Sequence, residues 1–271
     1  MSKNVVVIGA GAAGLMAAGF LAKRGAQVHV LEKMGKTASK IRISGKGRCN
    51  VTNMAPISEF IPHYPSNGRF LYSALHRFSN ESCLDFFAKL GVKLKEERGR
   101  RVFPVSDDAH EVAEALRQFA LSKGAKIHLN HIAREIELGS SGSIRGVHVE
   151  HHYQKVLFKA DAVIVATGGL SYPGTGSTGD GFVFAEGLGH KIIDPRPALV
   201  PIRVEEKWAG ELAGLSLRNV SFSVENPQGG TKSYFGELMF AHFGLTGPIV
   251  LTASEQIGIW LKQSGSVQTF I

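Results

Sequence analysis

The sequence contains few cysteines: only Cys49 and Cys83 occur among its 271 residues. It has no CxxC pair, and neither the cysteines nor the 11 histidines show the spacing of metal ligands. Disulfide-stabilised domains need more cysteine than this, and zinc sites need closely spaced ligand pairs. We therefore expect neither a disulfide framework nor a metal site.

Long apolar runs are also missing. The N-terminal stretch MSKNVVVIGAGAAG contains one apolar run, Val5–Ile8, which a glycine interrupts after four residues. That run is too short for a signal peptide or for a membrane span. We expect no membrane anchor and a cytoplasmic location.

The sequence has no long basic run, although its formal net charge is +8. The densest basic group is Arg98, Arg100 and Arg101. This group either neutralises an anionic substrate or cofactor or is an ordinary solvated charge run. Positive charge dispersed in this way favours solubility over a nucleic-acid surface, so we expect a small-molecule substrate and not a nucleic acid.

The first 32 residues predict a strand–helix–strand unit. Val5–Ile8 is typical of a strand buried on both faces, Ala12–Lys23 consists mostly of good helix formers, and Gln27–Leu31 is the next strand. Gly25 lies just past the helix as a stop signal. We expect the two strands to be parallel, with a right-handed crossover.

Later segments predict further elements of both kinds. We expect helices from a Ser79 cap to Leu90, after a Ser106 cap, and over Phe182–Leu188. Between them, KIHL, IAREIEL, SIRGVHVE and KVLFK read as short strands, and DAVIVATGG from Asp161 as a second buried strand. A proline-dense stretch, Pro195–Pro201, then marks a boundary, and we expect domains over residues 1–190 and 191–271.

The glycine motif at Gly9–Gly14 follows the first strand and opens the first helix, with Glu32 18 residues beyond it. This is the full context of a dinucleotide-binding turn. Gly9 makes the turn, Gly11 lets a pyrophosphate approach the backbone, and Gly14 lets helix and strand pack closely. Glu32 is suited to a ribose diol and disfavours a 2′-phosphate. These residues leave NAD and FAD as alternatives, since both contain an ADP half.

A second GxGxxG match, Gly174–Gly179, has Asp194 about 20 residues beyond it. No strand leads directly into this match, and Pro173 precedes it. We interpret it as a turn before the Phe182 helix that faces the same cofactor. A separate NAD(P) site is the alternative.

Six motifs occur in order along nearly the whole chain. They are GAGAAGLMAA (Gly9–Ala18), SGKGRCNVTN (Ser44–Asn53), GRRVFPVSDDA (Gly99–Ala109), ATGGLSYPGTGSTGDGF (Ala166–Phe182), PALVPI (Pro197–Ile202) and GELMFAHFGLTGP (Gly236–Pro248). In these motifs the sequence resembles the bacterial NAD(P)/FAD-dependent oxidoreductases also called aminoacetone oxidase family FAD-binding enzymes. That family lies within the superfamily of glutathione-reductase-like and fumarate-reductase-like FAD-binding proteins.

The resemblance implies an α/β fold: a three-layer, Rossmann-like FAD-binding domain with an antiparallel β-meander, plus a smaller strand-rich substrate domain. It implies that Ser44–Asn53 follows the cofactor's pyrophosphate and ribityl chain, that Ala166–Gly168 passes near its ADP portion, and that Ile132 contacts adenine. We therefore expect these residues to bind FAD: Gly9, Gly11, Ala12, Ala13, Gly14, Glu32, Lys33, Ser44, Gly45, Arg48, Cys49, Asn50, Ile132, Ala166, Thr167 and Gly168.

No residue type in the sequence identifies a catalytic group. Cys49 is either a redox thiol or, as we favour, a small packing residue, because disulfide-reductase flavoenzymes pair two cysteines. His242 is either an acid/base or structural; Ala241 stands where the family usually has threonine.

The resemblance implies FAD-dependent oxidation–reduction of a small organic molecule, with a pyridine nucleotide or oxygen as the electron partner. Members of the family are longer, so the sequence implies a chain shortened at its C-terminus. Two alternatives stay open: an FAD-binding fragment that is catalytically incomplete, and a flavoprotein that modifies tRNA, for which the charge of +8 is the support.

Overall fold

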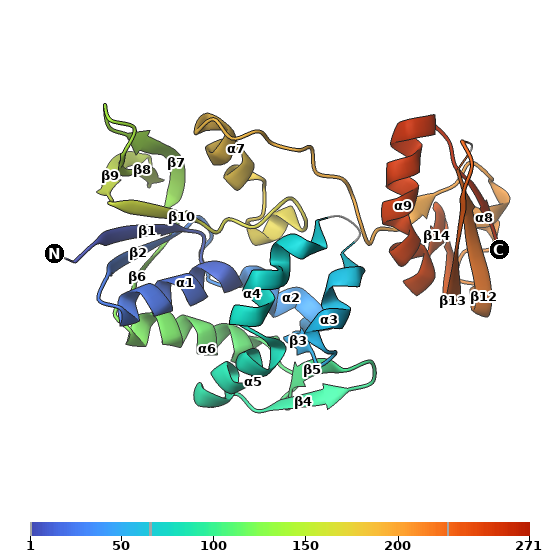
Figure 1. Cartoon of the computed structure of the whole chain (residues 1–271), viewed down its shortest axis with the longest axis horizontal. Coiled ribbons are helices and arrows are strands. Elements are labelled where there is room, and N and C mark those ends of the chain that lie inside the picture. Colours follow the sequence, from blue (N-terminus) through green and yellow to red (C-terminus); the bar gives the residue numbers. More distant parts are fainter. Residues whose placement is uncertain (1, 65–66, 227) are drawn as a thin grey trace. The chain divides into compact units, whose positions relative to one another are not determined.

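The computed structural model describes residues 2–64, 67–226 and 228–271 (Figure 1). The chain divides into two compact units, Met1–Ile192 and Ile193–Ile271. Within the described ranges, no helix is long and apolar enough to span a bilayer.

The first unit is built on a parallel sheet of four strands in the order β10–β1–β2–β6. The strands are β1 (Asn4–Ile8), β2 (Gln27–Glu32), β6 (Lys126–Leu129) and β10 (Ala162–Val165). β1 pairs in parallel with both β2 and β10, and Val5–Ile8 is buried throughout. The predicted strand–helix–strand unit is confirmed, since α1 (Ala12–Lys23) connects β1 to β2.

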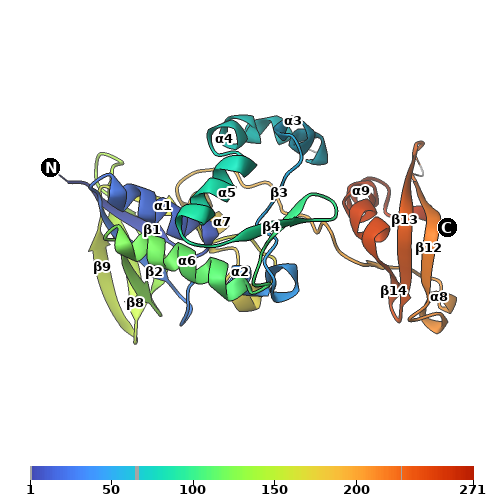
Figure 2. The ribbon, with the colours of Figure 1, turned by 90° about the horizontal axis from the view of Figure 1, so that it is seen from below.

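Two different layers cover the faces of this sheet (Figures 1 and 2). On one face lie α1 and α6 (Ala109–Ser122), whose core with the sheet includes Leu15, Val30 and Leu116. On the other lies an antiparallel meander, β7 (Ile132–Leu138), β8 (Ile144–His151) and β9 (Gln154–Lys159). This arrangement confirms the predicted α/β fold with three layers and a meander.

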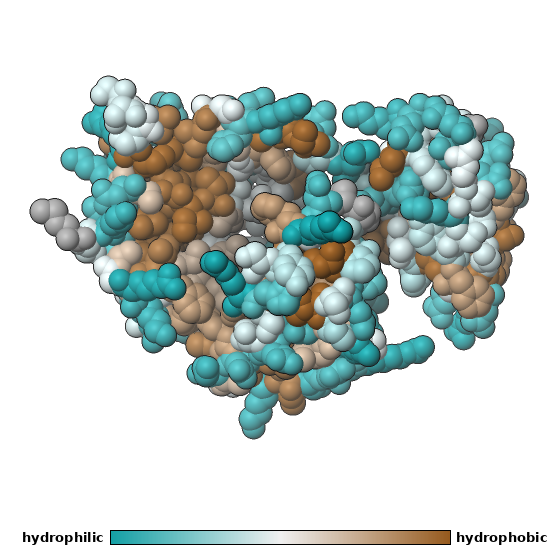
Figure 3. Space-filling model, in the orientation of Figure 1, coloured by the Kyte–Doolittle hydropathy of each residue, from teal (hydrophilic) through white to brown (hydrophobic). Residues whose placement is uncertain are grey.

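Shorter elements complete the first unit. A small antiparallel sheet has the order β3–β5–β4, and α7 follows β10. The remaining elements are α2 (Ser39–Ile43), η1 (Ser44–Gly47), β3 (Thr52–Asn53), α3 (Ile57–Phe60), η2 (Ile61–His63), η3 (Gly68–Leu71), α4 (Tyr72–Arg77), α5 (Asn80–Lys89), β4 (Leu94–Glu97), β5 (Arg101–Pro104), η4 (Pro173–Thr175) and α7 (Asp180–Gly187). Figure 3 shows apolar surface gathered near the β10 edge and α7, where Val165 and Val183 are exposed.

The second unit is an antiparallel sheet of order β11–β14–β13–β12–β15 with α9 packed on it. Its elements are β11 (Ile202–Arg203), α8 (Trp208–Glu211), β12 (Ser216–Glu225), β13 (Thr231–Ala241), β14 (Gly244–Thr246), α9 (Pro248–Ser264) and β15 (Gln268–Phe270). Helix α9 was not predicted from the sequence. Pro248 at the first helical position and buried Ile249, Ala253 and Ile257 were its signals.

The helix caps confirm one prediction and correct another. Ser79 caps α5 by accepting a hydrogen bond from the Ser82 N–H. The prediction that Ser106 caps α6 is wrong, because Asp108 holds that position and accepts from the His110 N–H. Ser106 instead hydrogen-bonds the Glu111 side chain and the Asp108 N–H. Both serine and aspartate are good N-cap residues, and Asp108 lies two residues closer to the first turn of α6 than Ser106 does.

Close packing between α1 and the turn after β1 depends on Gly14. A Cβ atom at Gly14 would lie 1.9 Å from the Gly9 carbonyl oxygen. A Cβ at Gly9 would lie 2.4 Å from the Ala166 carbonyl oxygen, and Gly9 itself has φ of +104°. The turn, the helix and the segment after β10 therefore meet backbone to backbone.

We expect Gly14→Ala to destabilise the protein by roughly 1–3 kcal/mol, because overpacking a tight contact forces the backbone apart. The matched control is Gly11→Ala, since a Cβ at Gly11 meets no atom within 4 Å. Urea unfolding of both variants measures the difference. Equal stability of the two variants would contradict this role of Gly14.

Candidate functional site

A cavity of about 370 Å³ lies where β1, β2 and β10 end. Parallel α/β sheets place their ligands at this carboxyl edge. Three separate segments supply most of its wall, together with His131 and Ala133. The lining residues are Ile8, Gly9, Gly11, Ala12, Ala13, Leu31, Glu32, Lys33, Ala38, Ser39, Lys40, Ile41, Ser44, His131, Ala133, Ala166, Thr167, Gly168, Thr175, Gly176, Ser177 and Asp180.

The N-terminus of α1 opens into this cavity. Gly11 is the N-cap, and the first residues of the helix, Ala12 and Ala13, line the wall. The first N–H groups of a helix have no partner within the helix, and the helix dipole adds partial positive charge there. Since an added Cβ at Gly11 would enter open space, an anionic group has room to approach these N–H groups.

The carboxylate of Glu32, in the cavity wall, accepts hydrogen bonds from the loops that follow β1 and β2. Its Oε2 accepts a hydrogen bond from the Ala10 N–H at 2.8 Å, and its Oε1 accepts one from the Met34 N–H at 2.8 Å. Glu32 is buried, with 9% of its surface exposed. Each carboxylate oxygen has more than one acceptor site, so Glu32 can still accept from a ribose hydroxyl.

Two lysines from the segment after β2 reach the opposite wall. Lys33 Nζ forms an ion pair with Asp180 at 2.7 Å. Lys40 Nζ donates to the Ser177 Oγ at 2.8 Å and to the Ser171 carbonyl oxygen at 2.8 Å. Burial raises the pKa of Asp180, but hydrogen bonds from Lys33 and Thr178 outweigh burial and lower it overall. Asp180 is therefore ionised at neutral pH.

His131 is a further wall residue that the sequence analysis did not select. Its Nδ1 lies 2.7 Å from the Leu129 carbonyl oxygen and must donate to it. The ring stacks on His151 with 4.0 Å between ring centroids. Ile132 was predicted to contact adenine; its neighbours His131 and Ala133 line the cavity, and Ile132 itself does not.

The cavity brings together ten of the sixteen residues predicted to bind a cofactor. They are Gly9, Gly11, Ala12, Ala13, Glu32, Lys33, Ser44, Ala166, Thr167 and Gly168. The other six do not line it: Gly14, Gly45, Arg48, Cys49, Asn50 and Ile132. The loop of the second GxGxxG match does line it, through Thr175, Gly176 and Ser177.

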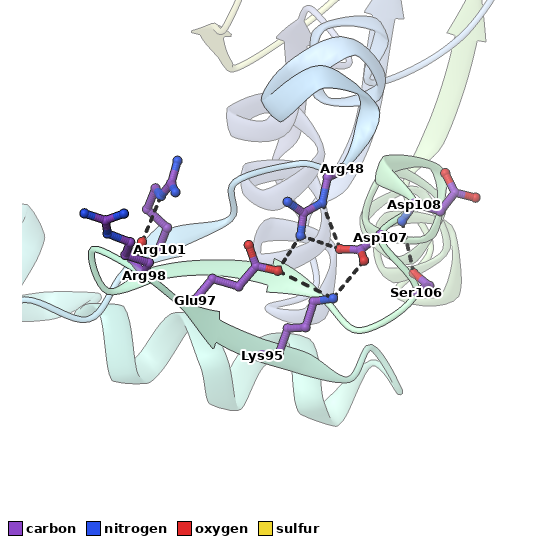
Figure 4. Close-up of polar contacts among 8 residues, drawn as sticks. All are labelled: Arg48, Lys95, Glu97, Arg98, Arg101, Ser106, Asp107 and Asp108. Atoms are coloured by element: carbon purple, nitrogen blue, oxygen red, sulfur yellow. Dashed lines mark hydrogen bonds and ion pairs between the residues drawn. The ribbon is translucent and has the colours of Figure 1, made fainter. Parts of the chain in front are cut away.

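Arg48 lies in a cluster of charges away from the cavity wall (Figure 4). Its guanidinium group pairs with Glu97 and, at 2.6 Å, with Asp107, and it lies over the Phe103 ring. Lys95 also pairs with Asp107, at 2.8 Å. These cations lower the pKa of both Glu97 and Asp107. Two carboxylates therefore accept from Nε and Nη2 of Arg48, a residue that was predicted to bind FAD.

The loop Ser44–Asn53 has an unusual backbone. Gly45, Lys46, Gly47 and Cys49 all have positive φ, between 56° and 85°. Positive φ costs little at glycine but strains Lys46 and Cys49. The loop begins at the cavity, at Ser44, and ends in β3, which pairs with β5. Strain concentrated at such a loop is typical of a functional segment.

Both cysteines contact one hydrophobic core, in which Cys49 is buried. Burial raises the pKa of Cys49, although a hydrogen bond with Ser44 opposes this. Burial, together with the nearby Cys49, raises the pKa of Cys83 to about 11. A redox thiol needs a lowered pKa, so these environments favour packing roles.

His242 belongs to the second unit, between β13 and β14. It is exposed, and its ring meets the edge of Phe243 with 4.9 Å between centroids. Neither residue lines the cavity of the first unit.

Residues 3–266 match the family described as "HI0933-like protein Rossmann domain". The chain is 36% identical over 259 residues to "Ribosomal RNA dihydrouridine synthase" of Haemophilus influenzae, covering 94% of this chain and 61% of that protein. It is 30% identical over 256 residues to "3-dehydro-bile acid delta(4,6)-reductase" of Clostridium scindens, covering 94% and 60%. The chain thus spans about three-fifths of the length of these relatives.

A solved structure supports the fold independently. The open conformation of a flavocytochrome c3 fumarate reductase has a TM-score of 0.58 at 21% identity, over 80% of this chain and 47% of that one. The Rossmann-like fold that the resemblance predicted is confirmed.

We expect both thiols to react slowly with DTNB at pH 8 in the folded protein. A pKa two units or more above that of an exposed thiol lowers the thiolate fraction about a hundredfold, and we expect this for Cys83. The variant Cys83→Ser isolates Cys49, and unfolding in urea should restore fast labelling. Labelling of native Cys49 as fast as that of a small thiol would contradict a packing role.

Proposed function

The chain belongs to the HI0933-like Rossmann family, and from this premise we propose that it is an FAD-dependent oxidoreductase. The observation that carries the proposal is the cavity at the N-terminus of α1, with open space in front of Gly11 and the Glu32 carboxylate in its wall. This combination suits the ADP half of a dinucleotide.

The residues that line the cavity fit FAD in three respects. The N–H groups at the start of α1 would bind the pyrophosphate, and Lys40 adds positive charge from the segment after β2, where Lys33 is already paired with Asp180. Glu32 would accept from the adenosine ribose and would repel a 2′-phosphate. Ser44 and the Ala166–Gly168 segment would bind the rest of the cofactor.

The names of the two relatives suggest one reaction class. Uridine becomes dihydrouridine when its C5=C6 bond, conjugated to a carbonyl, gains two hydrogens. A delta(4,6) bond system in a 3-dehydro bile acid is also conjugated to a carbonyl. We therefore propose reduction of a carbon–carbon double bond conjugated to a carbonyl group. FAD would supply hydride transfer to that bond, with a pyridine nucleotide as the source of electrons.

Charge favours a uracil base in RNA as the substrate over a free small molecule. The first unit contains 25 lysines and arginines against 16 aspartates and glutamates, whereas the second contains 6 against 7. The excess of positive charge therefore lies wholly in the unit with the cavity, as a polyanionic partner requires. This revises the expectation that a nucleic acid is disfavoured. A role of residues 193–271 in binding the substrate stays a prediction.

We expect Gly11→Ala to weaken FAD binding about tenfold or more, because its methyl group enters the space through which a phosphate approaches the helix N-terminus. Quenching of flavin fluorescence on titration with protein measures the affinity. Unchanged affinity in this stably folded variant would contradict binding of FAD at this turn.

We also expect the FAD-loaded protein with NAD(P)H under anaerobic conditions to reduce a conjugated double bond. Mass spectrometry of digested RNA would detect nucleosides that have gained two hydrogens, and a steroid enone tests the small-molecule alternative. An isolated alkene of similar size is the control, and it should not react. Oxidation of NAD(P)H with none of these substrates reduced would contradict the proposed reaction class.

A further inference from the structure

Residues 60–80 of the first unit are basic and contain no acidic residue. Between Glu59 and Glu81 the sequence contains no aspartate or glutamate but includes Arg69 and Arg77. Both arginines are exposed, and neither forms an ion pair with any residue that the structure describes. The segment contains η3 and α4.

The same segment exposes aromatic rings to an unusual degree. Phe70 is 86% exposed, Tyr72 55% and Tyr64 44%. The ring of Tyr72 packs against the ring of His76, with 4.3 Å between the ring centroids. Aromatic rings exposed close to arginines in the sequence suit a partner that offers flat surfaces and negative charge.

The β4–β5 hairpin contacts α3, which precedes this segment in the chain, and adds further arginines. Arg100 Nη1 pairs with Glu59 of α3 at 3.5 Å, and its carbonyl oxygen accepts from the Met54 N–H at 2.8 Å. Asn53 Nδ2 donates to the Gly99 carbonyl oxygen at 2.8 Å. These contacts join the hairpin to the chain that leads into the aromatic segment.

The hairpin arginines differ from the charged cluster at its base (Figure 4). There, Arg48 and Lys95 are neutralised by Glu97 and Asp107. Arg98 and Arg101 are exposed, and in the described chain neither pairs with a carboxylate; Arg101 Nε donates only to the Arg98 carbonyl oxygen. Their charge is therefore available to a partner.

We propose that these residues form a surface for single-stranded RNA, here called the aromatic–basic surface: Arg69, Phe70, Tyr72, Arg77, Arg98 and Arg101. The rings would stack on unpaired bases, and the arginines would pair with phosphates. The proposal rests on the proposed function, because the surface would bind the RNA that contains the uracil substrate. A lipid surface would also attract the arginines, but stacking favours RNA over lipid.

Fluorescence anisotropy of a uridine-rich single-stranded RNA with the FAD-loaded full chain tests the surface. We expect Arg98→Gln/Arg101→Gln to weaken binding about tenfold and to flatten its salt dependence, since two phosphate contacts are lost. We expect Phe70→Ala to weaken binding by roughly fivefold or more at every salt concentration, because stacking is lost. Phe70 is too exposed for this change to affect folding.

The matched control is Lys155→Gln/Lys159→Gln on β9, which removes two exposed charges from the meander. We expect its RNA affinity to change less than threefold. Equal losses in the two double variants, no effect of Phe70→Ala, or binding to phosphatidylserine vesicles without binding to RNA would each overturn the proposal.

Two further readouts separate this proposal from the proposed function. All variants should retain stoichiometric FAD and reduce a small enone at the wild-type rate. If they do and the wild type does not bind RNA, the surface proposal fails and the oxidoreductase stands. If the wild type retains no FAD, the proposed function itself fails.

Discussion

The bridge made by the Glu32 carboxylate is the interaction on which the site depends. It satisfies the N–H groups of Ala10 and Met34, which lie in loops after two different strands. Removing the carboxylate would leave two backbone donors near the core without partners, at a cost of about 1–3 kcal/mol each. The bridge fixes the glycine turn relative to the segment that contains Lys33 and Lys40, and so fixes two walls of the cavity.

The third wall comes from a distant part of the sequence, and backbone contacts set its position. β10 pairs with β1, which brings Ala166 so close to Gly9 that a Cβ atom at Gly9 would lie 2.4 Å from the Ala166 carbonyl oxygen. The loop that follows is then held by Lys33 through Asp180 and by Lys40 through Ser177. The partial positive charge of the helix N-terminus therefore faces a space whose wall also contains Lys40 and the paired Lys33 and Asp180. An anionic group of the cofactor suits the part of this space in front of the helix N-terminus.

The sequence predicted the parts of this arrangement that depend on local chemistry. The strand–turn–helix around Gly9–Gly14 and Glu32 has a short-range signature, and the meander has a period of two, so both could be recognised. The contacts of Arg48 could not, because they depend on β4 and β5 bringing Glu97 and Asp107 to it. His131 and Lys40 likewise reach the cavity only through the register of neighbouring strands and the fold of the loop after β2. Helix α9 was missed although its apolar spacing was visible.

The visible absorbance spectrum of the purified chain, after incubation with FAD and gel filtration, tests the central claim most directly. Heat release and chromatography would then identify and count any flavin that remains bound. We predict oxidised-flavin bands and one FAD per chain. A protein that is folded by circular dichroism but elutes colourless would contradict the assignment of this cavity to FAD.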